Sequence, residues 1–170
     1  MELLIFSDSH GNIHAMQNAL ARQIKSPDAI CFLGDGLSDI EKLDAPRSLL
    51  YTVRGNCDWG RLGDGYPTER QIELEGHKLL LTHGHLYSVK SGCGALLSYA
   101  ARIGADIVLF GHTHTPVSLM LPAGETVGEC CLSRPLYLFN PGSIGSTYEG
   151  GSFGTLTLRK ETVLLSHGKI

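Results

Sequence analysis

Acidic and histidine side chains recur in short motifs at the ends of apolar runs. The motifs are Asp8-Ser9-His10, Gly34-Asp35, Gly55-Asn56-Cys57-Asp58, Thr82-His83-Gly84 and Gly111-His112-Thr113-His114. Carboxylate oxygens and imidazole nitrogens are ligands that manganese, iron and zinc accept. Asp8 and His10 lie two residues apart and project to the same side of an extended segment, as do His112 and His114. The set predicts a site for two divalent metal ions, and two-metal sites of this kind catalyse the hydrolysis of phosphate esters.

A site of this kind needs one carboxylate that bridges two ions about 3.5–4 Å apart. Asp35, alone in its loop after Gly34, is the candidate bridge. Asn56 adds a neutral oxygen ligand and His83 adds a nitrogen. With neutral histidines, the carboxylates of Asp8 and Asp35 leave about two excess positive charges on the ions, which suits a bound hydroxide and a phosphate oxygen.

The elements that position these residues follow from the hydrophobic pattern. The first third of the chain predicts strands over 3–7, 29–33 and 49–53, and helices over 12–24 and 37–43. This alternation of strand and helix is typical of a parallel α/β layer. The remainder predicts a hairpin of 71–74 and 78–82, a helix over 91–103, and strands over 105–110, 117–120, 136–139, 154–158 and 162–166.

Five of the candidate ligands, Asp8, Asp35, Asn56, His83 and His112, each come just after a predicted strand. In α/β sheets, ligand sites form in the loops beyond the carboxyl ends of the strands. We therefore expect the motifs to meet at one edge. No repeat, low-complexity tract or linker interrupts the pattern, so we predict a single domain over residues 1–170.

Composition narrows the classes of protein further. With 42% apolar residues, the chain is typical of a soluble globular protein. Its net charge of −3 argues against binding to nucleic acid. No apolar run reaches the roughly 18 residues of a membrane span, and the N-terminus lacks a signal-peptide pattern. Five cysteines without a Cys-x-x-Cys pair indicate a reducing cytoplasm.

The ordered motif series resembles the calcineurin-like metallophosphoesterase superfamily from residue 3 to about 146. The short chain, Gly55-Asn56-Cys57-Asp58 and Asn140-Pro141-Gly142-Ser143 are similar to its compact bacterial and archaeal phosphodiesterase branch. The resemblance implies an α/β fold, a four-layer α/β/β/α sandwich with two mixed β-sheets. It also implies one metal held by Asp8, His10 and His114, a second held by Asn56, His83 and His112, and a bridge at Asp35. The usual metal is manganese, with iron, nickel or zinc possible.

One departure concerns proton donation. Many superfamily members have a histidine after the asparagine that can protonate the leaving group, whereas this chain has Cys57. A thiol with an ordinary pKa of about 8.5 is a poor substitute acid. We therefore expect either a preference for good leaving groups or a replacement acid, and His85 is the candidate. The alternative is that His85 supports the ligands or is exposed. Asp58 would orient the missing histidine, so its role is open.

A second departure follows Ser143. Related chains often continue to a Pro-Arg pair, but this one reads Ile144-Gly145-Ser146-Thr147-Tyr148. Arg54 is a candidate substitute, or else a salt-bridged loop residue. Four carboxylates outside the motifs are expected at the surface: Asp39, Glu41, Asp44 and Asp64. Gly150-Gly151-Ser152-Phe153-Gly154 matches a nucleophile elbow, but a strand is predicted after it where the elbow needs a helix.

The function predicted from these features is hydrolysis of a small-molecule phosphodiester, in which a metal-bridging hydroxide attacks phosphorus in line. A phosphomonoesterase is the nearest alternative. A different class is a non-catalytic scaffold, because a eukaryotic retromer subunit resembles this fold. A homo-oligomer is compatible with the sequence.

Overall fold

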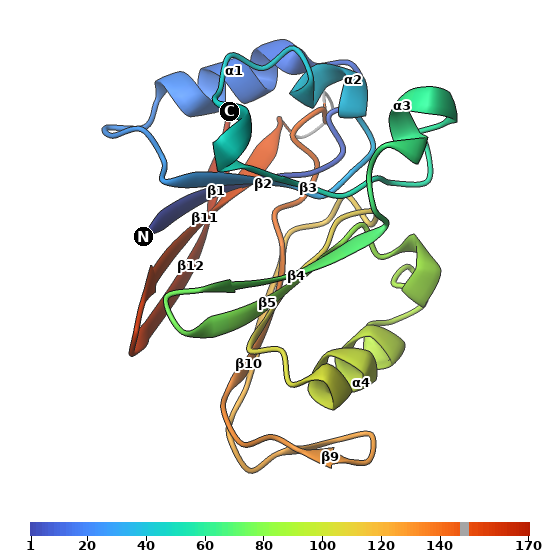
Figure 1. The fold of residues 1–170 in the computed structure, drawn as a ribbon, viewed down its shortest axis with the longest axis vertical. Coiled ribbons are helices and arrows are strands. Elements are labelled where there is room, and N and C mark those ends of the chain that lie inside the picture. The colour runs from blue at the N-terminus through green and yellow to red at the C-terminus, as the bar shows by residue number, and fades with distance from the viewer. Residues whose placement is uncertain (147–149) are drawn as a thin grey trace.

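Two five-stranded mixed sheets face each other in the computed structural model, which describes residues 1–146 and 150–170. Helices lie on the outer face of each sheet (Figure 1). The four-layer α/β/β/α sandwich expected from the sequence is confirmed. No helix of the described part of the chain is long and apolar enough to cross a membrane.

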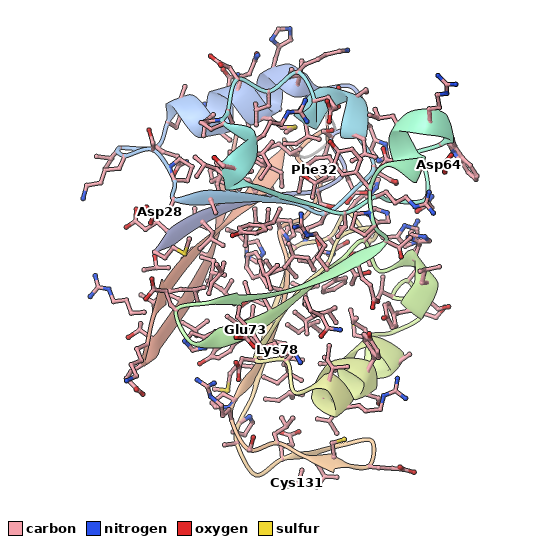
Figure 2. All side chains as sticks on the ribbon, in the orientation of Figure 1. Asp28, Phe32, Asp64, Glu73, Lys78 and Cys131 are labelled. Carbon is pink, nitrogen blue, oxygen red and sulfur yellow. The ribbon has the colours of Figure 1, made fainter. Side chains whose placement is uncertain are left out.

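The first sheet has the order β12-β11-β1-β2-β3. Its strands are β1 (Glu2–Phe6), β2 (Ala29–Phe32), β3 (Leu50–Thr52), β11 (Ser152–Arg159) and β12 (Thr162–Lys169). Strands β1, β2 and β3 are parallel, and β11 is antiparallel to both of its neighbours. Helices α1 (Ile13–Ala21) and α2 (Leu37–Ile40) cover this sheet (Figure 1). Met16 and Ile40 belong to one buried cluster with Phe6 and Phe32, of which Phe32 is labelled in Figure 2.

The second sheet has the order β4-β5-β6-β10-β7. Its strands are β4 (Glu69–Leu74), β5 (His77–Thr82), β6 (Ile107–Leu109), β10 (Leu136–Asn140) and β7 (Val117–Leu121). Helix α4 (Gly94–Ile103) packs on the outer face through Leu96 and Ala100. A short ribbon of β8 (Thr126–Val127) and β9 (Cys130–Cys131) contacts α4.

The core lies between the two sheets. Ile5, Cys31, Leu81, Leu109 and Phe139 have no exposed surface there. Strands covered on both faces need apolar residues at successive positions rather than in alternation. This explains why the central strands appear in the sequence as short continuous apolar runs, and why Cys31 is a core residue.

Several element boundaries differ from those expected. The first helix was expected to reach residue 24 but ends at Ala21, and the side chain of Ile24 is fully exposed. The hairpin turn is Glu75-Gly76, with His77 already buried in β5. Three short helices were not predicted: η1 (Arg47–Leu49), α3 (Gly60–Asp64) and η2 (His85–Tyr87). Segments of three to five residues are too short to show a hydrophobic period.

Candidate metal centre

The predicted ligand residues come together where loops from both sheets meet. The loops after β1 and β2 are joined by hydrogen bonds from Asp8 N to Gly34 O (2.9 Å) and from His10 N to Asp35 O (3.2 Å). In the second sheet, Gly111 N donates to His83 O (3.1 Å). The carboxyl ends of β1, β2, β3, β5 and β6 therefore supply one site.

A first cluster consists of Asp8, His10 and His114, whose ligand atoms all lie within 4.8 Å of one another. Asp8 Oδ1 is 3.2 Å from His114 Nε2 and 3.8 Å from His10 Nε2. The two imidazole Nε2 atoms are 3.3 Å apart. Asp8 is fully buried, while both histidines reach the surface. One carboxylate and two imidazoles converging in this way could hold a divalent ion.

A second cluster consists of Asp35, His83 and His112, with ligand atoms again within 4.8 Å. His83 Nε2 is 3.3 Å from Asp35 Oδ2 and 3.2 Å from Asn56 Oδ1. His83 Nδ1 is 2.7 Å from the carbonyl oxygen of Leu33. Since a carbonyl only accepts, Nδ1 carries a proton, which leaves Nε2 as the ring atom that would bind a metal ion.

Asp35 lies where the two clusters adjoin. Besides its group with His83 and His112, it forms another with His10 and Cys57. Its Oδ1 accepts a hydrogen bond from Cys57 N (2.7 Å). His83 Nε2 is also 3.9 Å from Asp8 Oδ1, so the clusters are contiguous.

The hydrogen bonding of Asp8 fits a bound cation. Its Oδ2 accepts from Ser7 Oγ (2.5 Å) and His112 N (3.0 Å), whereas Oδ1 is buried and has no hydrogen-bond partner among the described residues. A buried carboxylate oxygen without a partner is costly. Oδ1 is the atom that faces His10 and His114, so the donor set and the unpartnered atom indicate the same position for a metal ion.

The pKa shifts at the candidate ligands arise from burial and from imidazoles and carboxylates that face one another. Burial would lower the pKa of His83, but its hydrogen bond to Asp35 raises it. The carboxylate of Asp8 raises the pKa of His114. Burial, followed by the charge of His83, lowers the pKa of His112 to about 4. Burial alone would raise the pKa of Asp35. The hydrogen bond and charge of His83, together with the hydrogen bond from the Cys57 N–H, instead lower this pKa well below its usual range. Neutral imidazole and ionised carboxylate are the forms that bind metals.

Backbone strain is concentrated at these candidate ligands. Five of them have positive φ: Asp8 (55°), His10 (45°), Asp35 (59°), His112 (67°) and His114 (60°). Among the described non-glycine residues, only Glu75 and Ser88 share this conformation. Left-handed conformations at non-glycine residues cost about 1–3 kcal/mol each and are typically found at functional sites. The loops therefore hold these side chains in directions that a relaxed backbone would not give.

Asp58 contacts backbone rather than the clusters. Its two carboxylate oxygens accept hydrogen bonds from the N–H groups of Asp35 (2.8 Å), Gly36 (2.9 Å), Leu37 (2.9 Å) and Gly55 (2.8 Å). The residue thus ties the loop after β2 to the loop after β3. The sequence indicated Asp58 but not this arrangement.

Cys57 and His85 lie near different candidate ligands. Cys57 groups with His10 and Asp35, and partial desolvation followed by the carboxylate of Asp35 raises the pKa of its thiol to about 11. The His85 ring is half-buried, with its centroid 5.5 Å from that of His83 and 6.2 Å from that of His112. Burial, followed by the charge of His83, lowers the pKa of His85.

Asp39 was expected at the surface, and that prediction is wrong. Its side chain is buried and accepts hydrogen bonds from Ser9 Oγ (2.6 Å) and Gly11 N (2.8 Å). It therefore braces the loop that carries His10. Asp39 lies in the four-residue helix α2, which is too short for hydrophobic periodicity to indicate a buried face.

Other motifs acquire structural roles. Asn140 Nδ2 donates to Gly111 O (2.9 Å) and Ser143 Oγ donates to Asp8 O (2.8 Å), so both support ligand loops. Arg54 pairs with Asp64 (3.3 Å), which agrees with the salt-bridged alternative. Figure 2 labels Asp64 on α3. Ser152 begins β11 rather than preceding a helix, so the nucleophile elbow is excluded. Of the segment after Ser143, Thr147 and Tyr148 lie outside the described residues.

Comparison with known proteins identifies the class of this site. Residues 1–168 match the model of the calcineurin-like phosphoesterase superfamily domain. The chain belongs to this superfamily, as its motifs predicted.

Two bacterial relatives cover most of the chain. The probable metallophosphoesterase YsnB of Bacillus subtilis is 33% identical over 144 residues, which cover 85% of this chain and 75% of YsnB. The phosphodiesterase YfcE of Escherichia coli is 30% identical over 180 residues, covering 92% of this chain and 87% of YfcE.

Solved structures share the fold. A predicted phosphoesterase from Streptococcus pneumoniae superposes with a TM-score of 0.74 at 25% identity, covering 99% of this chain and 88% of that one. A Vps29 mutant from Entamoeba histolytica superposes with a TM-score of 0.70 at 22% identity. The superposition covers 100% of this chain and 99% of the Vps29 chain. At that identity, the second likeness concerns the fold alone.

Proposed function

We propose that the protein is a phosphodiesterase that uses two divalent metal ions. The observation that carries this proposal is the convergence of two adjoining ligand clusters on Asp35. In the proposed assignment Asp8, His10 and His114 hold one ion, and Asn56, His83 and His112 hold the other. Asp35 lies between them as the bridge, and manganese is the proposed metal, with iron, nickel or zinc as alternatives. Such a pair of ions supplies a hydroxide nucleophile and neutralises phosphoryl oxygens.

The proton donors near the clusters determine which leaving groups can depart readily. In hydrolysis of a diester, the oxygen of water bonds to phosphorus, one P–O ester bond breaks, and the departing alcohol oxygen gains a proton. The Cys57 thiol, with its pKa raised to about 11, is a weak donor for that proton. We therefore propose that the preferred substrates release alcohols that are stable as anions. His85, beside His83 and His112, is the other candidate donor.

Turnover and metal content test the function together. Protein reconstituted with manganese, iron, nickel or zinc is assayed on bis(p-nitrophenyl) phosphate and on p-nitrophenyl phosphate. We expect faster turnover of the diester, and a loss of at least about 100-fold in the Asp35→Asn variant. Faster turnover of the monoester would identify a phosphomonoesterase. Full metal occupancy without turnover of either ester would favour the scaffold, a reading with which the Vps29 likeness is compatible.

A second experiment concerns His85. If this residue protonates the leaving group, His85→Ala lowers kcat on a dialkyl phosphodiester by about 100-fold or more and leaves bis(p-nitrophenyl) phosphate nearly unchanged. Nitrophenolate departs without a proton, so it serves as the internal control. Undiminished kcat on the dialkyl diester would contradict the proposed proton transfer.

A further inference from the structure

We infer that Trp59 and the pocket beside it bind a planar aromatic group on an ester oxygen of the substrate. This inference rests on the proposed phosphodiesterase function. The pocket has a volume of about 180 Å³, and its walls include Leu37, Cys57, Asp58, Trp59 and Leu62. It lies beside α3, which follows directly after the motif that contains Asn56.

The pocket and the candidate metal centre share Cys57. Cys57 lines the pocket and also belongs to a group with His10 and Asp35, whose ligand atoms lie within 4.8 Å of one another. A phosphate at the clusters therefore has this pocket next to it. We infer that a group attached to one ester oxygen extends past Cys57 toward Trp59.

Trp59 is placed as a binding surface rather than as a core residue. Its side chain is 83% exposed, and the neighbouring Leu62 is 40% exposed. Covering exposed apolar surface with a ligand lowers the free energy of the complex, because that surface is removed from water. An indole face stacks on flat rings, including every nucleobase, largely independently of base identity. An aromatic group seated here would contact Trp59 and Leu62.

The walls of the pocket are preformed. The four backbone hydrogen bonds accepted by Asp58 fix the residue that precedes Trp59. The turn after Trp59 is close-packed, because a Cβ on Gly63 would lie 2.1 Å from the carbonyl oxygen of Asp58. Preorganisation of this kind reduces the entropic cost of binding. The pocket is thus suited to select among substrates.

The tryptophan permits a binding test that does not depend on turnover. Trp59 is the single tryptophan of the chain, so fluorescence excited at a wavelength that tyrosine does not absorb reports on this residue alone. Manganese-loaded protein is titrated with phenyl phosphate, thymidine 5′-phosphate and methyl phosphate. We expect a saturable fluorescence change with the two aromatic esters and none with methyl phosphate. Equal responses to all three, or no response, would overturn the inference.

Steady-state kinetics of Trp59 variants provide a second test of the aromatic subsite. The substrates are bis(p-nitrophenyl) phosphate, a thymidine dinucleotide and bis(2,2,2-trifluoroethyl) phosphate. For Trp59→Ala we expect KM to rise about tenfold on the ring-bearing diesters and to stay constant on the fluoroalkyl one, with Trp59→Phe near wild type. A rise confined to the nitrophenyl diester or to the dinucleotide distinguishes an aryl from a nucleobase subsite.

The matched control is Leu164→Ala. Leu164 is 60% exposed on β12, at the opposite edge of the first sheet from β3, and its truncation should leave all KM values unchanged. An equal effect of Trp59→Ala on all three diesters would indicate a structural role and refute the subsite. Fluorescence saturation without turnover of any diester would instead refute the proposed activity and leave the pocket assignment standing.

Discussion

Single side chains in this site are held mainly by backbone groups of neighbouring loops. Asp58 is the clearest case, because its carboxylate satisfies four N–H groups from the two loops that carry Asp35 and Asn56. Asp39 does the same for the loop that carries His10. These carboxylates orient ligands without needing to touch a metal, which is a common reason for their presence near metal sites.

Substitution of Asp58 tests this positioning role. Asp58→Asn replaces one acceptor oxygen by an N–H₂ group that opposes the backbone donors. We expect metal affinity to fall about 10–100-fold and the free energy of unfolding to fall by about 1–3 kcal/mol. Metal titration and denaturant unfolding measure the two effects. Asp44→Asn, at an exposed carboxylate, is the control, and equal results for both variants would contradict the role.

The loops between elements must approach one another closely for the ligands to meet, and this requires glycine. A Cβ on Gly111 would lie 1.9 Å from Ser7 Oγ and 2.9 Å from Asp8 Oδ2. A Cβ on Gly55 would lie 2.0 Å from Asp35 Oδ1. The glycines of the motifs therefore reflect contact between the β1, β2, β3 and β6 loops.

An alanine pair makes this requirement measurable. Gly111→Ala should destabilise the protein by about 1–3 kcal/mol, because overpacking displaces Ser7 and Asp8, and it should weaken metal binding. Gly94→Ala in the first turn of α4 meets no atom within 4 Å, so it should be neutral or stabilising by up to about 1 kcal/mol. The midpoints of denaturant unfolding of both variants, compared with wild type, measure the two changes in stability. Equal destabilisation would contradict the close-approach argument.

A polar network links α2, η1 and the segment after α3. Glu41, at the end of α2, accepts hydrogen bonds from Arg47 and Tyr66. The bonds from Arg47, then that from Tyr66, lower the pKa of Glu41 to about 2. Because the folded-state pKa is below the unfolded value, the network stabilises the fold above pH about 4.5, and this stability is lost as pH falls toward 2.

Thermal melts of Glu41→Gln against wild type test the network. At pH 7 the variant should melt at a lower temperature, and the difference in Tm should shrink between pH 4.5 and pH 2. Glu161→Gln, at an exposed position after β11, provides the control for loss of one charge. A Tm difference that is independent of pH over this range would contradict an ionised Glu41 in the folded state.

The molecule as a unit places its site across two sheets. Asp8, Asp35 and Asn56 follow strands of the first sheet, while His83 and His112 follow strands of the second. Metal ions held by both sets would link the sheets at one end of the shared core. Binding would also compensate the buried carboxylates of Asp8 and Asp35.

Metal binding should therefore stabilise the whole fold. At a free metal concentration of 100 times Kd, a single site contributes about 2.7 kcal/mol, which corresponds to a rise in Tm of roughly 5–10 °C for a chain of this size. Calorimetry with and without chelator measures it. Asp35→Asn should lose most of the increase and Asp44→Asn none. An unchanged Tm on chelation of fully loaded protein would contradict the linkage.

The sequence by itself determined the kinds of candidate ligand and their order, and its strand–helix alternation predicted a parallel α/β layer, whereas the four-layer sandwich was implied only by the family resemblance. Apolar runs define buried strands, and polar residues that follow parallel strands must share a sheet edge. These are local patterns, so they are visible without coordinates. Short segments such as α3, and the burial of Asp39, were not predictable, because non-local contacts rather than periodicity set them.

Only the tertiary structure decided how the motifs combine. It brought the ends of two separate sheets together, put Asp35 in groups with His83 and with His10, and left Asp8 Oδ1 unpartnered. It also assigned Asp58 to backbone N–H groups and placed Trp59 beside the site. Distances between residues far apart in the chain depend on how the sheets pack, and no spacing within one segment contains that information.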